Sequence, residues 1–230
     1  MEPIKIHYRF KFENGEKKDY ILLLDPEKIT YISKDPAPAP EWAKLEFHQC
    51  ESCPLDATQS PNCPIAANLS GFVEHFKDEI SHTEALVMVK ANDRFYSKRV
   101  SLQEGLYSVY GIIMSTSSCP VMTFLKPMAR FHLPFASMDE TVYRSISTYL
   151  LEQYFYFHKK GKDVDIKLAG LLDRYKEVEK VNVGISERLR AVTTGDADRN
   201  AVALLDTLAQ ILTFEVDKTL ESLSYLFIKD

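Results

Sequence analysis

The residues from Ile4 to Leu24, "IKIHYRFKFENGEKKDYILLL", decide the N-terminal architecture of this chain. Apolar and polar side chains alternate over the first nine of these residues, which is the period of a half-buried strand. The apolar face holds Ile4, Ile6, Tyr8, Phe10 and Phe12. Asn14-Gly15 comes next, and both residues tolerate the positive φ of a type I′ turn. We therefore expect a hairpin whose second strand covers residues 19–24.

Two further stretches have strand character. Residues 84–100, "EALVMVKANDRFYSKRV", predict a second hairpin that turns at Asn92-Asp93. A shorter alternating stretch, "AKLEFHQC" at residues 43–50, predicts another strand, in which His48 and Cys50 have the same parity and share one face.

Helical spacing appears between and after these hairpins. From Asn68 an apolar stripe recurs at the spacing of an amphipathic helix, at Leu69, Phe72, Val73, Phe76 and Ile80. Two later helices are expected to begin at capping boxes, which are Ser101 with Glu104 and Ser137 with Glu140. Behind the second box the helical spacing is kept by Val142, Ile146, Tyr149, Leu150 and Phe157.

The region from Asp165 to Arg190 carries an apolar stripe long enough for one long helix or two shorter ones. Asn182 lies on that stripe, where a buried amide must find hydrogen-bond partners. "TTGDADRN", residues 193–200, interrupts the pattern before a last helical region. Asp196 and Asp198 stand near the start of that region, where carboxylates cap free backbone amides.

These patterns predict an α+β fold with N-terminal antiparallel hairpins packed on a larger helical part. With 230 residues, 45% of them hydrophobic and only eight glycines, the chain can bury a large core and is not disordered. We expect one domain over residues 1–230, in which residues 1–100 are strand-rich and carry the cysteine segment, and residues 101–230 are helical.

The formal net charge of -5 gives no general attraction to phosphate backbones, so nucleic acid is not an expected partner. The first residues, "MEPIKIHYRF", lack the pattern of a signal peptide, and no apolar run is long enough to span a membrane. We expect a cytoplasmic protein without a membrane partner. In that compartment, clustered cysteines indicate metal binding or catalysis more often than disulfides.

The four cysteines are the main chemical signal. Cys50 and Cys53 bracket two residues, Cys63 follows within the same segment, and Cys119 lies far downstream. Four thiols are the number that a tetrahedral zinc site or a four-iron cluster requires. The sequence favours a structural zinc site. It leaves open an iron–sulfur cluster, reactive or redox thiols, packed thiols or a disulfide without metal, and His48 in place of one cysteine.

Proline follows three of the cysteines, in Cys53-Pro54, Cys63-Pro64 and Cys119-Pro120. Proline is favoured at the first position of a helix, so each of these cysteines is expected at or beside a helix N-cap. Free amides and the positive end of the helix dipole stabilise a thiolate there. The pattern therefore predicts lowered thiol pKa values, which suit a metal ligand and a nucleophile equally.

A second candidate site lies in "LKPMARFHLPFAS", residues 125–137, which holds Arg130 and His132 among apolar residues and prolines. Arg130 could bind an anionic small molecule with two hydrogen bonds, and His132 would titrate near neutrality. Arg144, on the next helix, is expected to face the same place. The alternative interpretation is a structural arginine beside a histidine whose hydrogen bonds are satisfied inside the fold.

Several of these segments together resemble a family of uncharacterised bacterial proteins known as a domain of unknown function. They are "LEFHQCESCPL", "CPIAANL", "SSCPVM", "KPMARFHLPFAS" and "ETVYRSISTYLLEQYF". The resemblance runs from about Trp42 to Asn200. It implies that these segments belong to one recurring fold, and it assigns no catalytic role to any residue.

The sequence thus favours a non-catalytic bacterial metal-binding module for interaction or regulation, held by Cys50, Cys53, Cys63 and Cys119. Its partner would be a protein, or an anionic small molecule bound by Arg130, His132 and Arg144. The alternative is an enzyme, a redox-active protein or an iron–sulfur protein that uses low-pKa thiols with His132 or His48 as acid–base group. Whether the chain is an enzyme, and its oligomeric state, stay open at this point.

Overall fold

The computed structural model describes residues 1–33, 38–214 and 216–228. The strands are β1 (Ile4–Phe12), β2 (Lys17–Leu24), β3 (Glu84–Ala91) and β4 (Arg94–Ser101). The α-helices are α1 (Pro64–Phe76), α2 (Leu102–Thr116), α3 (Lys126–Arg130), α4 (Met138–Lys160), α5 (Ala169–Val192), α6 (Ala197–Phe214) and α7 (Val216–Leu223). Short 3₁₀ helices are η1 (Glu41–Ala43), η2 (Pro120–Leu125) and η3 (Ser224–Leu226). The predicted α+β class is confirmed.

The strands form one antiparallel sheet in the order β2-β1-β3-β4. The alternation in β1 places Tyr8 and Phe10 in the core, where neither side chain is exposed to solvent. Both predicted hairpins are confirmed, but the first does not turn through a two-residue type I′ loop. Only Gly15 has a positive φ there, and the Phe12 N–H bonds to the Glu16 carbonyl, so the connection is longer.

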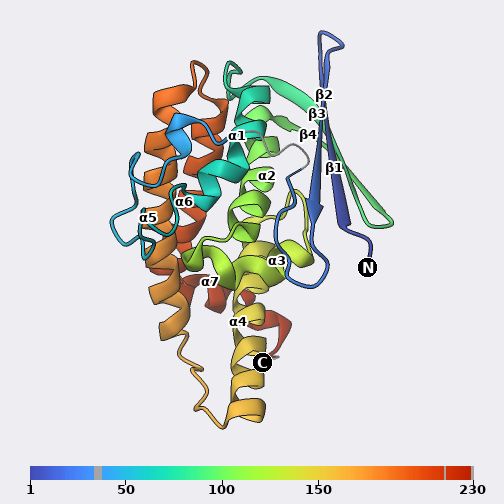
Figure 1. Cartoon of the computed structure of the whole chain (residues 1–230). Coiled ribbons are helices and arrows are strands. Elements are labelled where there is room, and N and C mark those ends of the chain that lie inside the picture. The colour runs from blue at the N-terminus through green and yellow to red at the C-terminus, as the bar shows by residue number, and fades with distance from the viewer. Residues whose placement is uncertain (34–37, 215, 229–230) are drawn as a thin grey trace.

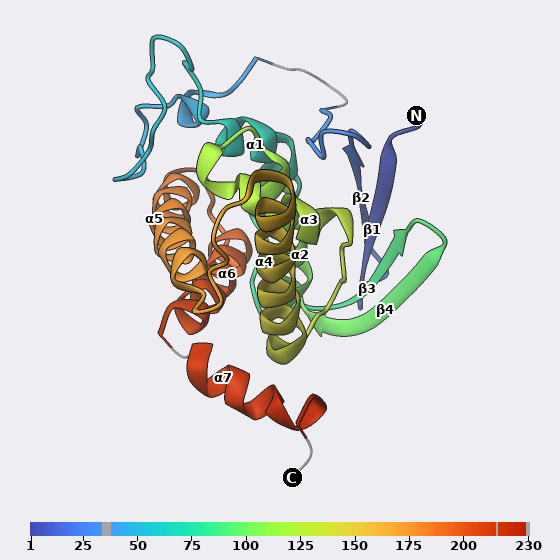
Figure 2. The ribbon, with the colours of Figure 1, turned by 90° about the horizontal axis from the view of Figure 1, so that it is seen from below.

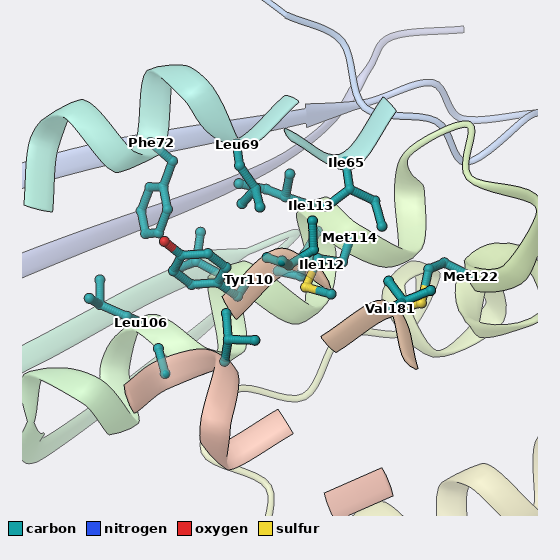
Figure 3. Close-up of a cluster of buried hydrophobic side chains, with 14 of the residues drawn as sticks. Ile65, Leu69, Phe72, Leu106, Tyr110, Ile112, Ile113, Met114, Met122 and Val181 are labelled. Carbon is teal, nitrogen blue, oxygen red and sulfur yellow. The ribbon is translucent and has the colours of Figure 1, made fainter. Parts of the chain in front are cut away.

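α1 and α2 lie between the sheet on one side and α5 and α6 on the other (Figures 1 and 2). Figure 3 shows Ile65, Leu69 and Phe72 of α1 directed toward Tyr110 and Ile113 of α2. One buried cluster runs from the strands through α6, so the strand-rich and helical parts share a core. α1 begins at Pro64, as the Cys63-Pro64 pair predicts and four residues before the apolar stripe was expected to begin, and Ile80 lies beyond its end and is exposed.

Both predicted capping boxes are present at α2 and α4. The Ser101 N–H donates to Glu104 (3.0 Å), and the Ser137 N–H donates to Glu140 (2.7 Å). The prediction of one apolar stripe behind the second box is only partly correct. Val142, Ile146 and Tyr149 are buried, whereas Leu150 and Phe157 are exposed on another face of α4.

The region expected to hold one helix or two forms a single helix, α5. No one helix in the described part of the chain is long and apolar enough to cross a membrane, although α2 and the bent Pro120–Arg130 segment pass that test as a pair broken by 113°.

Asp196 and Asp198 have different surroundings at the start of α6. Asp196 accepts hydrogen bonds from the Ser81 N–H (2.7 Å) and hydroxyl (3.0 Å). Asp198 is buried, with 1% of its surface exposed, and accepts a hydrogen bond from the Tyr110 hydroxyl (2.6 Å). Burial raises the pKa of Asp198 to about 7. The predicted capping role is therefore wrong for Asp198, because its carboxyl group is buried and accepts its hydrogen bond from Tyr110.

We expect Asp198→Asn to be more stable than the parent chain at pH 8 by a few kcal/mol, and this difference to vanish near pH 4. Because the folded pKa is above the unfolded value of 3.8, the folded state binds the proton more tightly between these values. This carboxyl therefore lowers the free energy of unfolding as pH rises from about 4 to 7. Urea denaturation of both chains at several pH values measures the difference. A difference that does not change with pH would contradict the assignment.

Candidate metal centre

The loop between β2 and α1 places three of the cysteines beside α5. The Leu45 N–H donates to the Pro61 carbonyl (2.9 Å), and the Cys63 N–H donates to the Ala43 carbonyl (2.8 Å). These bonds clip the two ends of the loop together. The predicted strand at residues 43–50 is therefore wrong. Its backbone groups bond within the loop and to α5, and the chain turns at His48, which has a φ of +48°.

Arg188 of α5 anchors this loop. Its side chain is only 1% exposed, and its guanidinium donates to the carbonyl oxygens of Trp42 (2.6 Å), Lys44 (2.8 Å) and Leu45 (2.9 Å). The guanidinium also lies over the Phe47 ring, with 6.0 Å to the ring centroid. Its Nε atom is buried without a hydrogen-bond partner. A buried charge is costly unless it is compensated, so this arginine needs an explanation.

The cysteines enter the site from three segments. A tight turn, closed by the Cys53 N–H and the Cys50 carbonyl (3.0 Å), joins the first pair. Cys63 is the N-cap residue of α1 and Cys119 is that of η2, each followed by proline, as predicted. The same prediction is wrong for Cys53, because no helix follows it. All four thiols are free.

The four thiols lie within electrostatic reach of one another. In their ionised forms, Cys63, Cys53 and Cys119 raise the pKa of Cys50, and Cys63 and Cys53 raise that of Cys119. Ionised Cys63, Cys50 and Cys53 likewise raise the pKa of Arg188. Segments that are far apart in the sequence therefore bring all four thiols to one region, and three of them lie within electrostatic reach of a buried cation.

The predicted lowering of the thiol pKa is wrong for Cys119, and the pKa of Cys50, for which no lowering was predicted, is also raised. Burial raises the pKa of Cys50 to about 12. Burial also raises the pKa of Cys119, although the backbone N–H groups of Met122 and Val121 act in the opposite direction. Desolvation of the thiolate outweighs the two N–H groups at the N-cap. Neither thiol has the properties of an exposed low-pKa nucleophile.

α5 leaves room for the loop at one glycine. A Cβ atom added at Gly184 would lie 2.8 Å from the Cys50 sulfur and 3.4 Å from the His48 carbonyl oxygen. Gly184 and Arg188 are one helical turn apart, and both contact the loop that carries the cysteines. Sequence analysis missed both residues. The available signal was Arg188 itself, a charged residue at helical spacing from Val181 and Ile185 on the apolar stripe.

Within the described ranges, no group of three or more His, Cys, Asp or Glu side chains is arranged closely enough to hold a metal ion. A metal would therefore have to draw the four thiols closer together than they lie here. His48, the alternative ligand, is exposed, and its ring packs against the Phe47 ring with 4.9 Å between centroids.

The second candidate site is divided between two cavities. Arg130 and His132 line a pocket of about 350 Å³ with Arg94 of β4, whereas His132 and Arg144 line a smaller cavity of about 130 Å³. Arg144 donates to the carbonyls of Met128 (2.9 Å) and Phe131 (2.8 Å), so it holds the turn after α3. His132 thus separates Arg130 from Arg144.

His132 does not titrate near neutrality as predicted. Its Nε2 atom lies 2.5 Å from the Tyr8 hydroxyl oxygen. Desolvation there and, to a smaller extent, the nearby charge of Arg144 lower the pKa of His132 to about 3. The imidazole is therefore neutral at physiological pH, and its contacts match the structural alternative.

Comparison with known proteins gives one match. A family model described as a domain of unknown function, DUF6901, matches residues 6–228. No curated protein and no solved structure is detectably similar to the chain.

Proposed function

Since this chain belongs to DUF6901, a family of domains of unknown function, its role must be inferred from its own residues, and we propose a non-catalytic metal-binding module for interaction or regulation. In this module one metal ion, with zinc favoured, binds to Cys50, Cys53, Cys63 and Cys119. The proposal includes a cytoplasmic location, because thiolate ligands need a reducing compartment.

The observation that carries this proposal is the buried positive charge of Arg188 beside the thiols. Four thiolates around one divalent ion leave two excess negative charges, which a buried site must compensate. Among the described residues, no carboxylate pairs with Arg188, and the charges that act on it are those of Cys63, Cys50 and Cys53. If the four cysteines bind a metal as thiolates, the positive charge of Arg188 compensates the excess negative charge of the metal site.

Two further features support metal binding by thiolates of these cysteines. The backbone N–H groups of Val121 and Met122, at the N-cap of η2, lower the pKa of Cys119, and such donors favour the charged form of a ligand. The Cys50–Cys53 spacing also matches the close ligand pairs of structural zinc sites. The ion would join the β2–α1 loop, the start of α1 and η2 at one point against α5, which is a stabilising role.

We expect the purified chain to hold about one metal ion, and Cys119→Ser to release it and to melt at a lower temperature. Metal-dependent stability is lost because a structural site contributes its binding energy to folding. Ser118→Ala is the matched control, since Ser118 is the adjacent residue and is exposed. Elemental analysis measures the metal, and thermal unfolding with and without a chelator measures its effect.

The outcomes of this experiment separate the alternatives. Zinc without visible absorption supports the proposal, whereas iron with visible absorption indicates a cluster. A parent chain without metal, or a Cys119→Ser chain that keeps its metal and its melting temperature, would overturn the four-cysteine site.

As a partner site, we propose the pocket of about 350 Å³ that Arg130 and Arg94 line, where an anionic small molecule would meet two guanidinium groups. Arg144 is engaged with backbone carbonyls, so its role there is to position the wall of the pocket.

A further inference from the structure

α4 carries a second apolar face whose large side chains are about half exposed. Its members are Tyr143, Leu150, Tyr154 and Phe157, with Ser147 between the first two, and the four large side chains are 39–52% exposed. The successive spacings of 4, 3, 4 and 3 residues equal the repeat of a helix that pairs with another helix. We call this set the α4 stripe.

The α4 stripe consists of other residues than the two faces of α4 that line the core and a groove, and α7 also contacts α4. Val142, Ile146 and Tyr149 are buried in the core. Leu151 and Phe155 line a groove of about 960 Å³ between α4 and α5. Figure 1 shows the C-terminal half of α4 extending below the sheet.

The charges along α4 have opposite signs at its two ends. The first turn contains Asp139 and Glu140, and the last turn contains His158, Lys159 and Lys160. Two such helices attract each other when they run antiparallel, because each acidic end then lies level with a basic end. A parallel pair would place like charges together.

The α4 stripe is also symmetric about Leu150. Tyr143 and Phe157 each lie seven residues from it, and Glu140 and Lys160 each lie ten residues away, about 15 Å along the helix. An antiparallel pair with its two-fold axis at Leu150 therefore sets Tyr143 opposite Phe157 and the acidic turn level with the basic turn. Such self-complementarity is what an isologous interface requires.

We propose that the α4 stripe is a homodimer interface, in which α4 of a second copy of this chain packs antiparallel across Leu150. This inference is independent of the metal site. The symmetry of the stripe and of its end charges selects a second copy over other occupants, because an unrelated partner would impose no symmetry on this helix.

The test is the mass of the full chain and of two variants in solution, measured by light scattering after size-exclusion chromatography. We expect twice the chain mass of 26.4 kDa for the parent chain and 26.4 kDa for Leu150→Glu, because the variant sets two carboxylates against each other at the axis. Leu151→Glu, one residue away on the groove side, is expected to stay dimeric. If Leu150→Glu does not fold, Tyr154→Glu takes its place.

Oxidative crosslinking tests the direction of the pair. A mixture of the Tyr143→Cys chain with the Phe157→Cys chain should form a covalent dimer, whereas neither chain alone should do so beyond the parent chain's level. Crosslinking of Tyr143→Cys alone would indicate a parallel pair and overturn the proposal. A monomeric parent chain would also overturn the proposal. If that monomer binds phosphatidylglycerol vesicles and its Leu150→Glu variant does not, the stripe is a membrane-binding surface instead.

Discussion

Arg188→Met is expected to lower the free energy of unfolding by about 3–5 kcal/mol, even in metal-free protein. The methionine fills much of the same space but cannot donate hydrogen bonds. The carbonyls of Trp42, Lys44 and Leu45 would lose the donor that now holds them at 2.6–2.9 Å. Unpaired buried carbonyls are costly, so the loop that carries Cys50 and Cys53 should detach from α5 before the core unfolds. Urea denaturation in the presence of a chelator measures the loss.

Arg190→Met is the matched control for this experiment. Arg190 lies two residues further along α5, is exposed, and pairs with Glu187 (2.6 Å) across one helical turn. Exposed pairs of this kind contribute little, so the control should change stability by less than about 0.5 kcal/mol. Equal effects of the two substitutions would show that Arg188 does not anchor the loop. In metal-loaded protein, the Arg188→Met chain should also bind zinc about 10–100-fold more weakly.

Gly195→Ala is expected to destabilise the fold by about 3 kcal/mol or more. The connection between α5 and α6 crosses the turn after α1 closely enough for the Gly195 N–H to bond to the Lys77 carbonyl (2.8 Å). An added Cβ atom would lie 2.1 Å from the Glu79 carbonyl oxygen and 2.6 Å from the Glu79 nitrogen. These are backbone atoms, so relief requires one of the two segments to move as a whole.

Gly71→Ala provides the opposite result in the same measurement. Gly71 lies within α1, and a Cβ atom there meets nothing within 4 Å. Alanine is preferred to glycine inside a helix, so this change should stabilise the chain by about 0.5–1 kcal/mol. A Gly195→Ala chain with unchanged denaturation would mean that the α5–α6 connection does not lie as close to the turn as described here.

The hairpins and most helix boundaries could be predicted because the interactions that specify them are local. Alternation in β1 depends on successive side chains pointing to opposite faces, and each capping box satisfies amides three residues away. The segment 43–50 shows where this reasoning fails. It alternates like a strand, but its hydrogen bonds go to Pro61 and Arg188, which local spacing does not reveal.

The candidate site was predictable in its residue types and not in its surroundings. The cysteines were identified from their spacing and from the prolines that follow three of them. The structure brings these cysteines within electrostatic reach of one another. Metal binding itself stays a prediction. The raised pKa of Cys50 and the neutral state of His132 were not predictable, because desolvation depends on neighbours that come from other segments.

By itself, the sequence determined the α+β class, the two hairpins, the capping of α2 and α4, and which residues could act as ligands. Each of these follows from side chains within about four positions of one another. Only the tertiary structure decided that Arg188 and Asp198 are buried, that Leu150 and Phe157 are exposed, and that Cys119 lies within electrostatic reach of a loop more than fifty residues away. Burial is set by segments that are distant in the chain and adjacent in space, so no periodicity within one segment can specify it.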